Sequence, residues 1–254
     1  MSENVIAVAS RPVLSIGADS SVKEAAEFMA SRNVRRLLVT EGGRAVGVFS
    51  AFHLIRALAT GTDPSAKSVS EAGLEVPVYV EPTTPVIEAA RIMASRDVTS
   101  VLVGSEDNPL GILTTHDVVF SLPSLRFGRE DLHGALVQGY PTLDPEATLL
   151  EAASVISSRG VSGVLIMDGD DFIGALTVRE VLQAYASGGS QALSSRVADF
   201  PMPPLAHADE GASVGEVAEA MESVGSDMAV VFCGRRACGA VDDITLTRWL
   251  ASRL

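Results

Sequence analysis

One pattern recurs four times along this chain, and this repetition constrains the fold more than any other feature. Four helix-like segments begin at Ser21, Pro85, Thr148 and Ser213. They carry a glutamate in the same column, and a glycine follows each: Glu24 and Gly47, Glu88 and Gly111, Glu151 and Gly174, Glu216 and Gly239. Both columns are spaced by 64, 63 and 65 residues. The sequence therefore predicts four copies of one folding unit.

Length and composition suit a globular protein and argue against some partners. The chain has 254 residues, of which 47% are hydrophobic, enough for a sizeable buried core. A net charge of −13 repels a phosphate backbone, so nucleic acid is not expected as a partner. No apolar run approaches the ~18 residues of a membrane span, and the N-terminus lacks the basic region of a signal peptide. We therefore expect a cytoplasmic protein that does not enter a membrane.

Cysteine usage excludes a disulfide framework and a cysteine-based zinc site. Cys233 and Cys238 are the only two cysteines, and they lack paired metal-site spacing. Buried free thiols are the favoured interpretation, with a disulfide across a hairpin as the alternative.

The second repeat shows the order of elements most clearly. A β-branched and aromatic run at 76–80 predicts a strand, and apolar residues spaced i, i+3, i+4 and i+7 from Val86 predict an amphipathic helix with Thr84 as N-cap and Pro85 at its first position. Apolar runs at 100–103 and 110–113 predict a hairpin, and a second helix is expected at about 115–121. In the other repeats Ser21, Thr148 and Ser213 precede glutamate by three residues, the pattern of a capping box.

The unit resembles the cystathionine-β-synthase (CBS) domain. The resemblance rests on this order of elements, on the unit length, and on the run Val98-Thr99-Ser100-Val101-Leu102-Val103 followed by Gly111-Ile112-Leu113-Thr114-Thr115-His116-Asp117. It implies an α/β (α+β) fold of four tandem β-α-β-β-α units at 1–64, 65–124, 130–188 and 193–254. Units would pair into two Bateman modules, 1–124 and 130–254, with the segment 123–133 as a hinge.

The resemblance also implies what the modules bind. Bateman modules hold AMP, ADP, ATP or S-adenosylmethionine in clefts between paired units, as regulatory ligands rather than catalytic cofactors. They often associate as flat discs within a chain or between chains, so a homodimer is one arrangement that the family allows. A regulated partner protein is implied, but its identity is not.

Asp117 and Thr114 are the strongest candidates for ligand contact. A carboxylate can accept charge-assisted hydrogen bonds from both ribose hydroxyls, and a hydroxyl with free N–H groups at a helix start suits a phosphate. Thr-x-x-Asp at a helix start is also a capping box that needs no ligand, and this alternative stays open. His116 lies between the two residues and would line the cleft.

The positions that open the second strand could also face a cleft, as the resemblance implies. In the first repeat they are Arg35 and Arg36, which could bind a phosphate held between repeats 1 and 2 or could form a solvated edge or an ion pair. The corresponding residues of the second repeat are Val98, Thr99 and Ser100.

The remaining repeats depart from the Thr-x-x-Asp pattern. Repeat 1 has Ser50 and His53, which keeps the hydroxyl but loses the carboxylate. Repeat 3 has Thr177 and Glu180, whose longer carboxylate could still reach a ribose. Repeat 4 begins its helix with Asp242-Asp243-Ile244-Thr245, so its cleft is expected to be degenerate or empty.

The sequence offers no catalytic constellation. It contains no phosphate-binding loop of the GxxxxGK[ST] kind and no nucleophile with a base and an orienting group, and its four histidines, His53, His116, His133 and His207, are scattered. The leading hypothesis is therefore a non-catalytic sensor of adenine nucleotides. The alternative is an interaction or scaffold protein with vestigial clefts.

Overall fold

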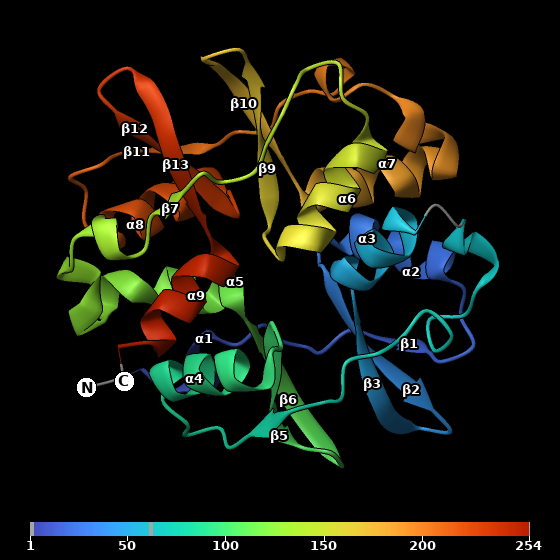
Figure 1. The fold of residues 1–254 in the computed structure, drawn as a ribbon. Helices are drawn as coiled ribbons and strands as arrows, with labels where there is room; N and C mark the ends of the chain where they lie inside the picture. The colour runs from blue at the N-terminus through green and yellow to red at the C-terminus, as the bar shows by residue number, and fades with distance from the viewer. Residues whose placement is uncertain (1–2, 61–62, 254) are drawn as a thin grey trace.

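The computed structural model describes residues 3–60 and 63–253, and it contains the four predicted units (Figure 1). Unit 1 comprises β1 (Ser15–Gly17), α2 (Val22–Arg32), β2 (Arg36–Glu41), β3 (Arg44–Ser50) and α3 (Ala51–Ala59). Unit 2 comprises β4 (Tyr79–Val80), α4 (Val86–Arg96), β5 (Ser100–Ser105), β6 (Asn108–Thr114) and α5 (Thr115–Ser121).

Units 3 and 4 repeat the same order of elements. Unit 3 comprises β8 (Thr142–Leu143), α6 (Leu149–Arg159), β9 (Gly163–Asp168), β10 (Asp171–Thr177) and α7 (Val178–Gly188). Unit 4 comprises β11 (Ala206–Asp209), α8 (Val214–Val224), β12 (Met228–Cys233), β13 (Arg236–Asp242) and α9 (Asp243–Ala251). The connections contain α1 (Val5–Val8), β7 (Val137–Gln138) and six short 3-10 helices: η1 (Pro64–Ala66), η2 (Leu122–Ser124), η3 (Arg126–Arg129), η4 (Leu132–Gly134), η5 (Gly189–Ser194) and η6 (Val197–Asp199).

The first helix of three units begins with the predicted capping box. In unit 1 the Ser21 N–H donates to Glu24 Oε2 at 2.8 Å, and the Glu24 N–H donates back to Ser21 Oγ at 3.1 Å. Equivalent boxes start α6 and α8. Unit 2 differs from the prediction by one residue, because α4 begins at Val86 and Pro85 is its N-cap, without a side-chain cap bond. The strand expected at 76–80 is also shorter, since only Tyr79 and Val80 pair with β5.

Each unit forms a small sheet in which the first strand is parallel to the second and the second is antiparallel to the third. In unit 4 the short strand β7 adds to the free edge of β13. The predicted hairpin of unit 2 is present as β5 and β6, with Ser100 opposite Thr114. This register places the start of the second strand beside the start of the second helix.

The repeated glycine column lies where segments cross between paired units. A Cβ on Gly47 would lie 2.6 Å from Leu74 Cβ, which belongs to the segment that leads into unit 2. In the same way Gly111 faces Ser10 and Arg11, which lead into unit 1, and Gly239 faces Val137. The lead-in segment of one unit therefore runs across the last strand of its neighbour, and only glycine leaves room for this approach.

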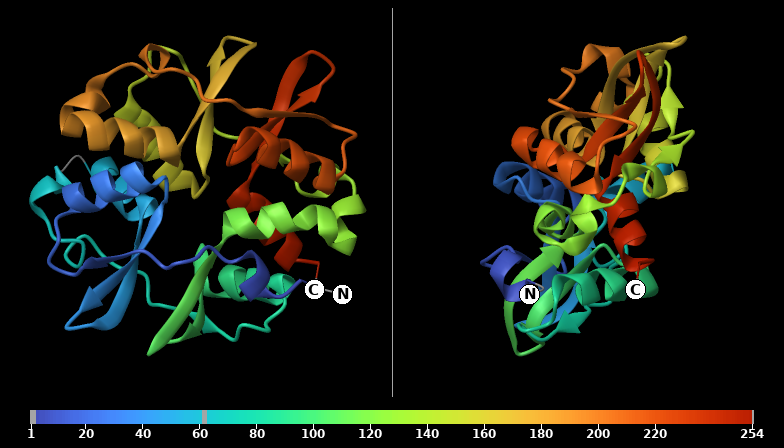
Figure 2. Two further views of the ribbon diagram at one scale, coloured as in Figure 1. Left: turned by 180° about the vertical axis from the view of Figure 1, so that it is seen from behind. Right: turned by 90° about the vertical axis from the view of Figure 1, so that its left-hand side faces the viewer.

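The sheets pair units 1 with 2 and 3 with 4, as two Bateman modules. Leu38 and Val48 of unit 1 pack with Leu102 of unit 2, and a second cluster joins the sheets of units 3 and 4 around Leu165 and Val230. The modules then meet through their helices, with α2 and α3 against α6 and α7, and with α4 and α5 against α8 and α9. The result is a flattened four-unit disc, which Figure 2 shows from behind and from the side.

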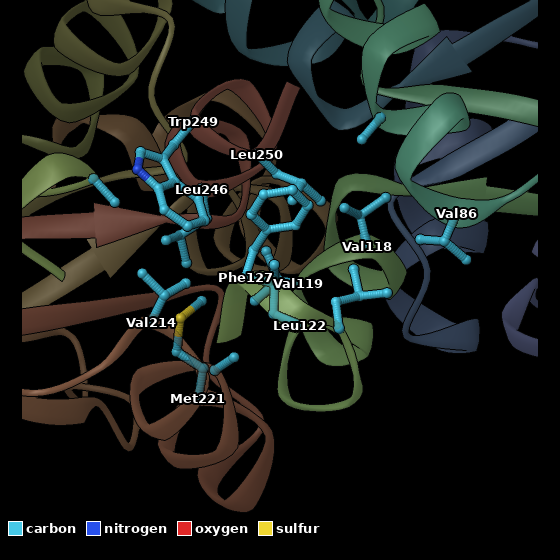
Figure 3. Close-up of a cluster of buried hydrophobic side chains, with 14 of the residues drawn as sticks. Val86, Val118, Val119, Leu122, Phe127, Val214, Met221, Leu246, Trp249 and Leu250 are labelled. Carbon is cyan, nitrogen blue, oxygen red and sulfur yellow. The ribbon is translucent and has the colours of Figure 1, made fainter. Parts of the chain in front are cut away.

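The predicted hinge at 123–133 is wrong. This segment folds into η2, η3 and the start of η4, and its Phe127 and Leu132 side chains are buried in the cluster that joins units 2 and 4. Figure 3 shows Phe127 beside Leu122 and Val119 of unit 2, facing Leu246 and Leu250 of α9. The Pro, Gly and charged residues of the segment supply its turns, whereas its apolar residues fix it to the core.

Two further features complete the description. Cys233 and Cys238 form a disulfide across the β12–β13 hairpin, with their Cα atoms 5.7 Å apart, so the favoured interpretation of free thiols is wrong and the hairpin alternative is correct. Within residues 3–60 and 63–253, no helix has the length and apolar character needed to cross a bilayer.

Leu132→Ala tests whether the connecting segment is part of the core. Because Leu132 is fully buried, we expect its truncation to lower the free energy of unfolding by about 2–5 kcal/mol. Val76→Ala is the control, since Val76 is 79% exposed. Urea denaturation measures both variants, and a similar small loss in each would show that the segment is a loosely attached hinge after all.

Candidate functional site

A cavity of about 400 Å³ lies between units 1 and 2, and we call it the Asp117 cleft. The residues that line it come from the lead-in segment of unit 1, from the end of α2 and the start of β2, and from the start of α5: Ser10, Arg11, Pro12, Leu14, Asn33, Val34, Arg35, Arg36, Ile112, Thr114, His116 and Asp117, with Arg179 of unit 3. The structure thus brings together five residues that the sequence nominated, namely Thr114, His116, Asp117, Arg35 and Arg36.

Asp117 caps α5 through one carboxylate oxygen, and its other oxygen remains available as a hydrogen-bond acceptor. Its Oδ2 accepts hydrogen bonds from the Thr114 N–H and from Thr114 Oγ1, both at 2.8 Å. Among the described residues, no donor bonds to the other oxygen, Oδ1. Burial raises the pKa of Asp117 above its ordinary value, although the Thr114 bonds, His116 and Arg36 oppose the shift. Thr114 and Asp117 therefore form the capping box that the alternative proposed. This box uses only one carboxylate oxygen, so it leaves the other available for a ligand.

A second cavity of about 720 Å³ lies between units 3 and 4, and we call it the Glu180 cleft. Glu180 Oε2 accepts from the Thr177 N–H at 2.8 Å and from Thr177 Oγ1 at 2.6 Å, which is the same arrangement as at Asp117. The opposite wall contains Gly225, Ser226 and Asp227, and Phe200 with three prolines forms an apolar side.

The corresponding position in unit 1 holds His53, a buried side chain. This side chain is 6% exposed, and its Nδ1 accepts from the Ser50 N–H at 3.0 Å. A ring nitrogen that accepts is unprotonated, so the imidazole is neutral with its proton on Nε2. Burial, together with Arg56 and Arg36, lowers the pKa of His53 to about 4. Ser50 and His53 therefore cap α3, and neither lines the Asp117 or the Glu180 cleft.

In unit 4, the helix start at Asp242 is bonded to Tyr140 inside the protein. The fully buried Asp242 accepts from Tyr140 Oη at 2.6 Å and from the Ser162 N–H at 2.9 Å, while its Oδ1 caps Thr245 at 2.7 Å. Burial and the adjacent Asp243 raise the pKa of Asp242. Both oxygens of this carboxylate accept hydrogen bonds inside the protein, and the expectation of a degenerate cleft stays a prediction.

All four units contribute to one cluster at the centre of the disc. Asp227 of unit 4 lies 2.7 Å from Arg35 of unit 1, 3.1 Å from His116 Nδ1 of unit 2, and 3.6 Å from Arg179 of unit 3. The Asp227 side chain is 1% exposed. Burial alone would raise its pKa, but Arg35, His116 and Arg179 outweigh that effect and hold the pKa well below its ordinary value.

Asp243 forms a second buried anion beside this cluster. Its Oδ2 accepts from Thr115 Oγ1 at 2.7 Å and lies 3.9 Å from Arg35, and its Oδ1 accepts from Ser162 Oγ. Arg35 is therefore held between two carboxylates of unit 4. In contrast, His116 Nδ1 and Asp227 Oδ1 face each other without hydrogen-bond geometry.

Some predicted site residues lie elsewhere, and some important residues were missed. Val98 and Thr99 line a separate space of only about 20 Å³ between units 2 and 4, and Ser100 lines none of the cavities described here. The sequence analysis did not nominate Arg11, Arg179 or Asp227. The repeat itself held the signal for two of them, because Arg179 shares a column with His116, and Asp227 shares one with Arg35. Over residues 3–60 and 63–253, no group of three acidic, His or Cys side chains could hold a metal ion.

His53 gives the stability a pH dependence with a definite sign. The unfolded chain binds a proton at His53 near pH 6.5, whereas the folded protein does so only near pH 4. The contribution of His53 to the free energy of unfolding is therefore fully present above pH 6.5 and is lost as the pH falls below this value. We expect a loss of about 2 kcal/mol from this group between pH 7.5 and pH 5. His53→Gln keeps a capping side chain but cannot titrate. Urea denaturation at both pH values should show a flatter dependence in the variant, and an equal dependence in both proteins would contradict the assignment.

Comparisons with known proteins agree with this architecture. The crystal structure of a protein from Methanocaldococcus jannaschii, described as a candidate archaeal homolog of g-AMPK, has a similar fold. The two structures superpose over 97% of this chain and 99% of the other, with a TM-score of 0.84 and 15% sequence identity. A conserved uncharacterized protein of Pyrococcus horikoshii matches over 98% and 100% of the two chains, with a TM-score of 0.67 and 18% identity. These likenesses show a shared fold.

Sequence relatives match parts of the chain. An uncharacterized protein of Methanopyrus kandleri is 26% identical over 120 residues, which are 46% of this chain and 61% of that protein. Arabinose 5-phosphate isomerase of Escherichia coli is 27% identical over 101 residues, 39% of this chain and only 31% of the isomerase. The family model named CBS domain matches residues 5–60, 69–124 and 136–187, which is more than half of the sequence. This chain belongs to the CBS domain family.

Proposed function

We propose that the protein is a cytoplasmic regulatory module, without catalytic activity of its own, that binds adenosine-type ligands in the Asp117 and Glu180 clefts. AMP, ADP, ATP and S-adenosylmethionine are the ligands that the family suggests. One observation carries the proposal: two units place a helix-capping carboxylate at an open cavity, whereas the equivalent helix starts of the other two contain the buried side chains of His53 and Asp242.

The two carboxylates are suited to a ribose. In each, one oxygen fixes the side chain by accepting two hydrogen bonds from the preceding threonine. The rotamer is therefore set before any ligand arrives, so that little entropy is lost on binding. The second oxygen can accept from the 2′- and 3′-hydroxyls, and hydrogen bonds to a carboxylate are stronger than neutral ones.

The position of the clefts suits a regulatory role. A ligand in the Asp117 cleft would contact units 1 and 2 and would also meet Arg35, His116 and Arg179, which surround Asp227 of the other module. Binding can therefore alter the contacts between the two modules. A ligand that has different affinity for two arrangements of the modules shifts the population between them, and a partner protein can respond to that shift.

Asp117→Ala tests the assignment of the ribose contact. We expect the unaltered protein to gain about 2.7 kcal/mol in stability at a ligand concentration 100 times the dissociation constant, measured as a rise in melting temperature with AMP or adenosine. In the variant most binding to the Asp117 cleft should be lost, while stability without ligand falls by only about 1 kcal/mol through the lost cap.

Glu151→Ala is the matched control. It removes a capping carboxylate of the same kind from α6, where Glu151 is exposed and lines neither cleft. We expect it to lose the cap energy and keep full ligand binding in calorimetric titration. If none of the four family ligands shifts the melting temperature of the unaltered protein, the proposal is wrong and the scaffold hypothesis is favoured.

A further inference from the structure

The two open clefts are built from equivalent positions of the repeat, so their differences can be read residue by residue. Thr114 and Asp117 correspond to Thr177 and Glu180. The opposite wall follows the first helix of the neighbouring unit, where both α2 and α8 end in a left-handed C-cap, at Asn33 and at Gly225. The residues that line the two cavities can therefore be compared position by position.

Three arginines of the Asp117 cleft have no cationic counterpart in the Glu180 cleft. Arg35 and Arg36 are the second and third residues after Asn33, and the same count from Gly225 gives Asp227 and Met228. The strand pairing aligns the two lead-in segments: Ser15 lies opposite Leu38, and His207 lies opposite Val230, which is the residue of unit 4 equivalent to Leu38. Ser15 and His207 are therefore equivalent positions. Counting back four residues from each aligns Arg11 with Pro203.

Arg36 carries a positive charge that no direct ion pair neutralises, since Asp117, Asp243 and Glu75 act on it only at longer range. It is 9% exposed and lines the Asp117 cleft, and among residues 3–60 and 63–253 no carboxylate lies within ion-pair distance. Its Nε also lacks a hydrogen-bond partner within that part of the chain. A buried cation without a direct ion pair is unfavourable, so an anion bound in this cleft would relieve part of the cost.

The Glu180 cleft has the opposite character. Asp227 lies in its wall, in addition to Glu180 itself, and the rest of the wall is largely apolar. Its one arginine, Arg179, is already engaged, since NH1 donates to Asn33 at 2.8 Å and NH2 lies 3.6 Å from Asp227. A phosphate in this cleft would find no unengaged cation, because Arg179 is already held by Asn33 and Asp227.

From this contrast we propose that the two clefts divide adenosine ligands by charge. The Asp117 cleft takes an adenosine compound with a phosphate on its 5′ end, with Arg36 as the counter-ion. The Glu180 cleft takes an adenosine compound with an uncharged or positively charged 5′ group, such as a thioether or a sulfonium. This inference rests on the proposed function, because both clefts must first bind adenosine.

Calorimetric titration of two single-cleft variants tests the division. Glu180→Gln leaves the Asp117 cleft, and Asp117→Asn leaves the Glu180 cleft. The ligands are AMP and 5′-methylthioadenosine, which share the nucleoside and differ in the charge at the 5′ end. We expect the Glu180→Gln protein to prefer AMP by about tenfold or more, and the Asp117→Asn protein to prefer 5′-methylthioadenosine by a similar factor.

Arg36→Met then tests the residue that we hold responsible. The substitution places in the Asp117 cleft the residue that unit 4 carries at the same position. In the Glu180→Gln background we expect AMP affinity to fall about tenfold or more while 5′-methylthioadenosine affinity stays the same, so that a general loss of folding would be recognised by a loss of both. In the Glu180→Gln protein, the affinity for AMP should also fall with added salt, whereas the affinity for 5′-methylthioadenosine should not change.

The outcomes separate this inference from the proposed function. If neither compound binds either variant or the unaltered protein, the proposed function fails. If both compounds bind, and the two single-cleft variants show the same preference, the clefts bind adenosine but do not divide ligands by charge. An Arg36→Met protein that keeps its preference for AMP would likewise overturn the role of Arg36.

Discussion

The contact of Asp227 with Arg35, His116 and Arg179 is the interaction on which the assembled disc depends. These four residues come from four different units and meet where both modules face each other. A buried carboxylate is costly unless cations surround it, and removing one partner of a buried pair typically costs about 3–5 kcal/mol. Apolar packing between helices also joins the modules, whereas in this charged cluster Asp227 has its three cations beside it only when all four units are assembled. It therefore contributes specificity of assembly more than strength.

The same cluster connects the interior of the disc to both ligand cavities. Arg179 lines the Asp117 cleft and the Glu180 cleft, and Asp227 lies in the wall of the second. Any ligand group that attracts Arg35 or Arg179 must compete with Asp227 for it. The proposed ligand binding and the module packing would thus use the same limited set of charges, which gives a physical basis for coupling between the two clefts.

The sequence predicted what local patterns control. Capping residues, apolar spacing and the glycine column recur within each copy, so the order of elements followed from them, whereas the module pairing and the ligand role of the Thr114–Asp117 motif came from the resemblance to the CBS domain. The sequence failed where the answer depends on contacts between units. Val98, Thr99 and Ser100 occupy the same positions as Val34, Arg35 and Arg36, yet they lie away from the open clefts. The segment 123–133 has the composition of a hinge, but Phe127 and Leu132 find a buried surface that only the folded disc provides. Asp227 is separated from Arg35 by most of the chain, and no short-range pattern predicts their contact.

A repeated scaffold explains why two of its four clefts can be closed without loss of the fold. In every unit, the position of Asp117 and Glu180 is the third residue of the second helix. A side chain there that accepts a hydrogen bond from the N–H of the N-cap residue stabilises the beginning of the helix. His53 fulfils that role as a neutral imidazole, and Thr245 fulfils it with Asp242 as its partner. Capping thus requires only an acceptor, whereas ribose binding requires a carboxylate with a second, unused oxygen beside an open space. Substitutions that keep the first property and lose the second would therefore remove a ligand site while they retain the unit.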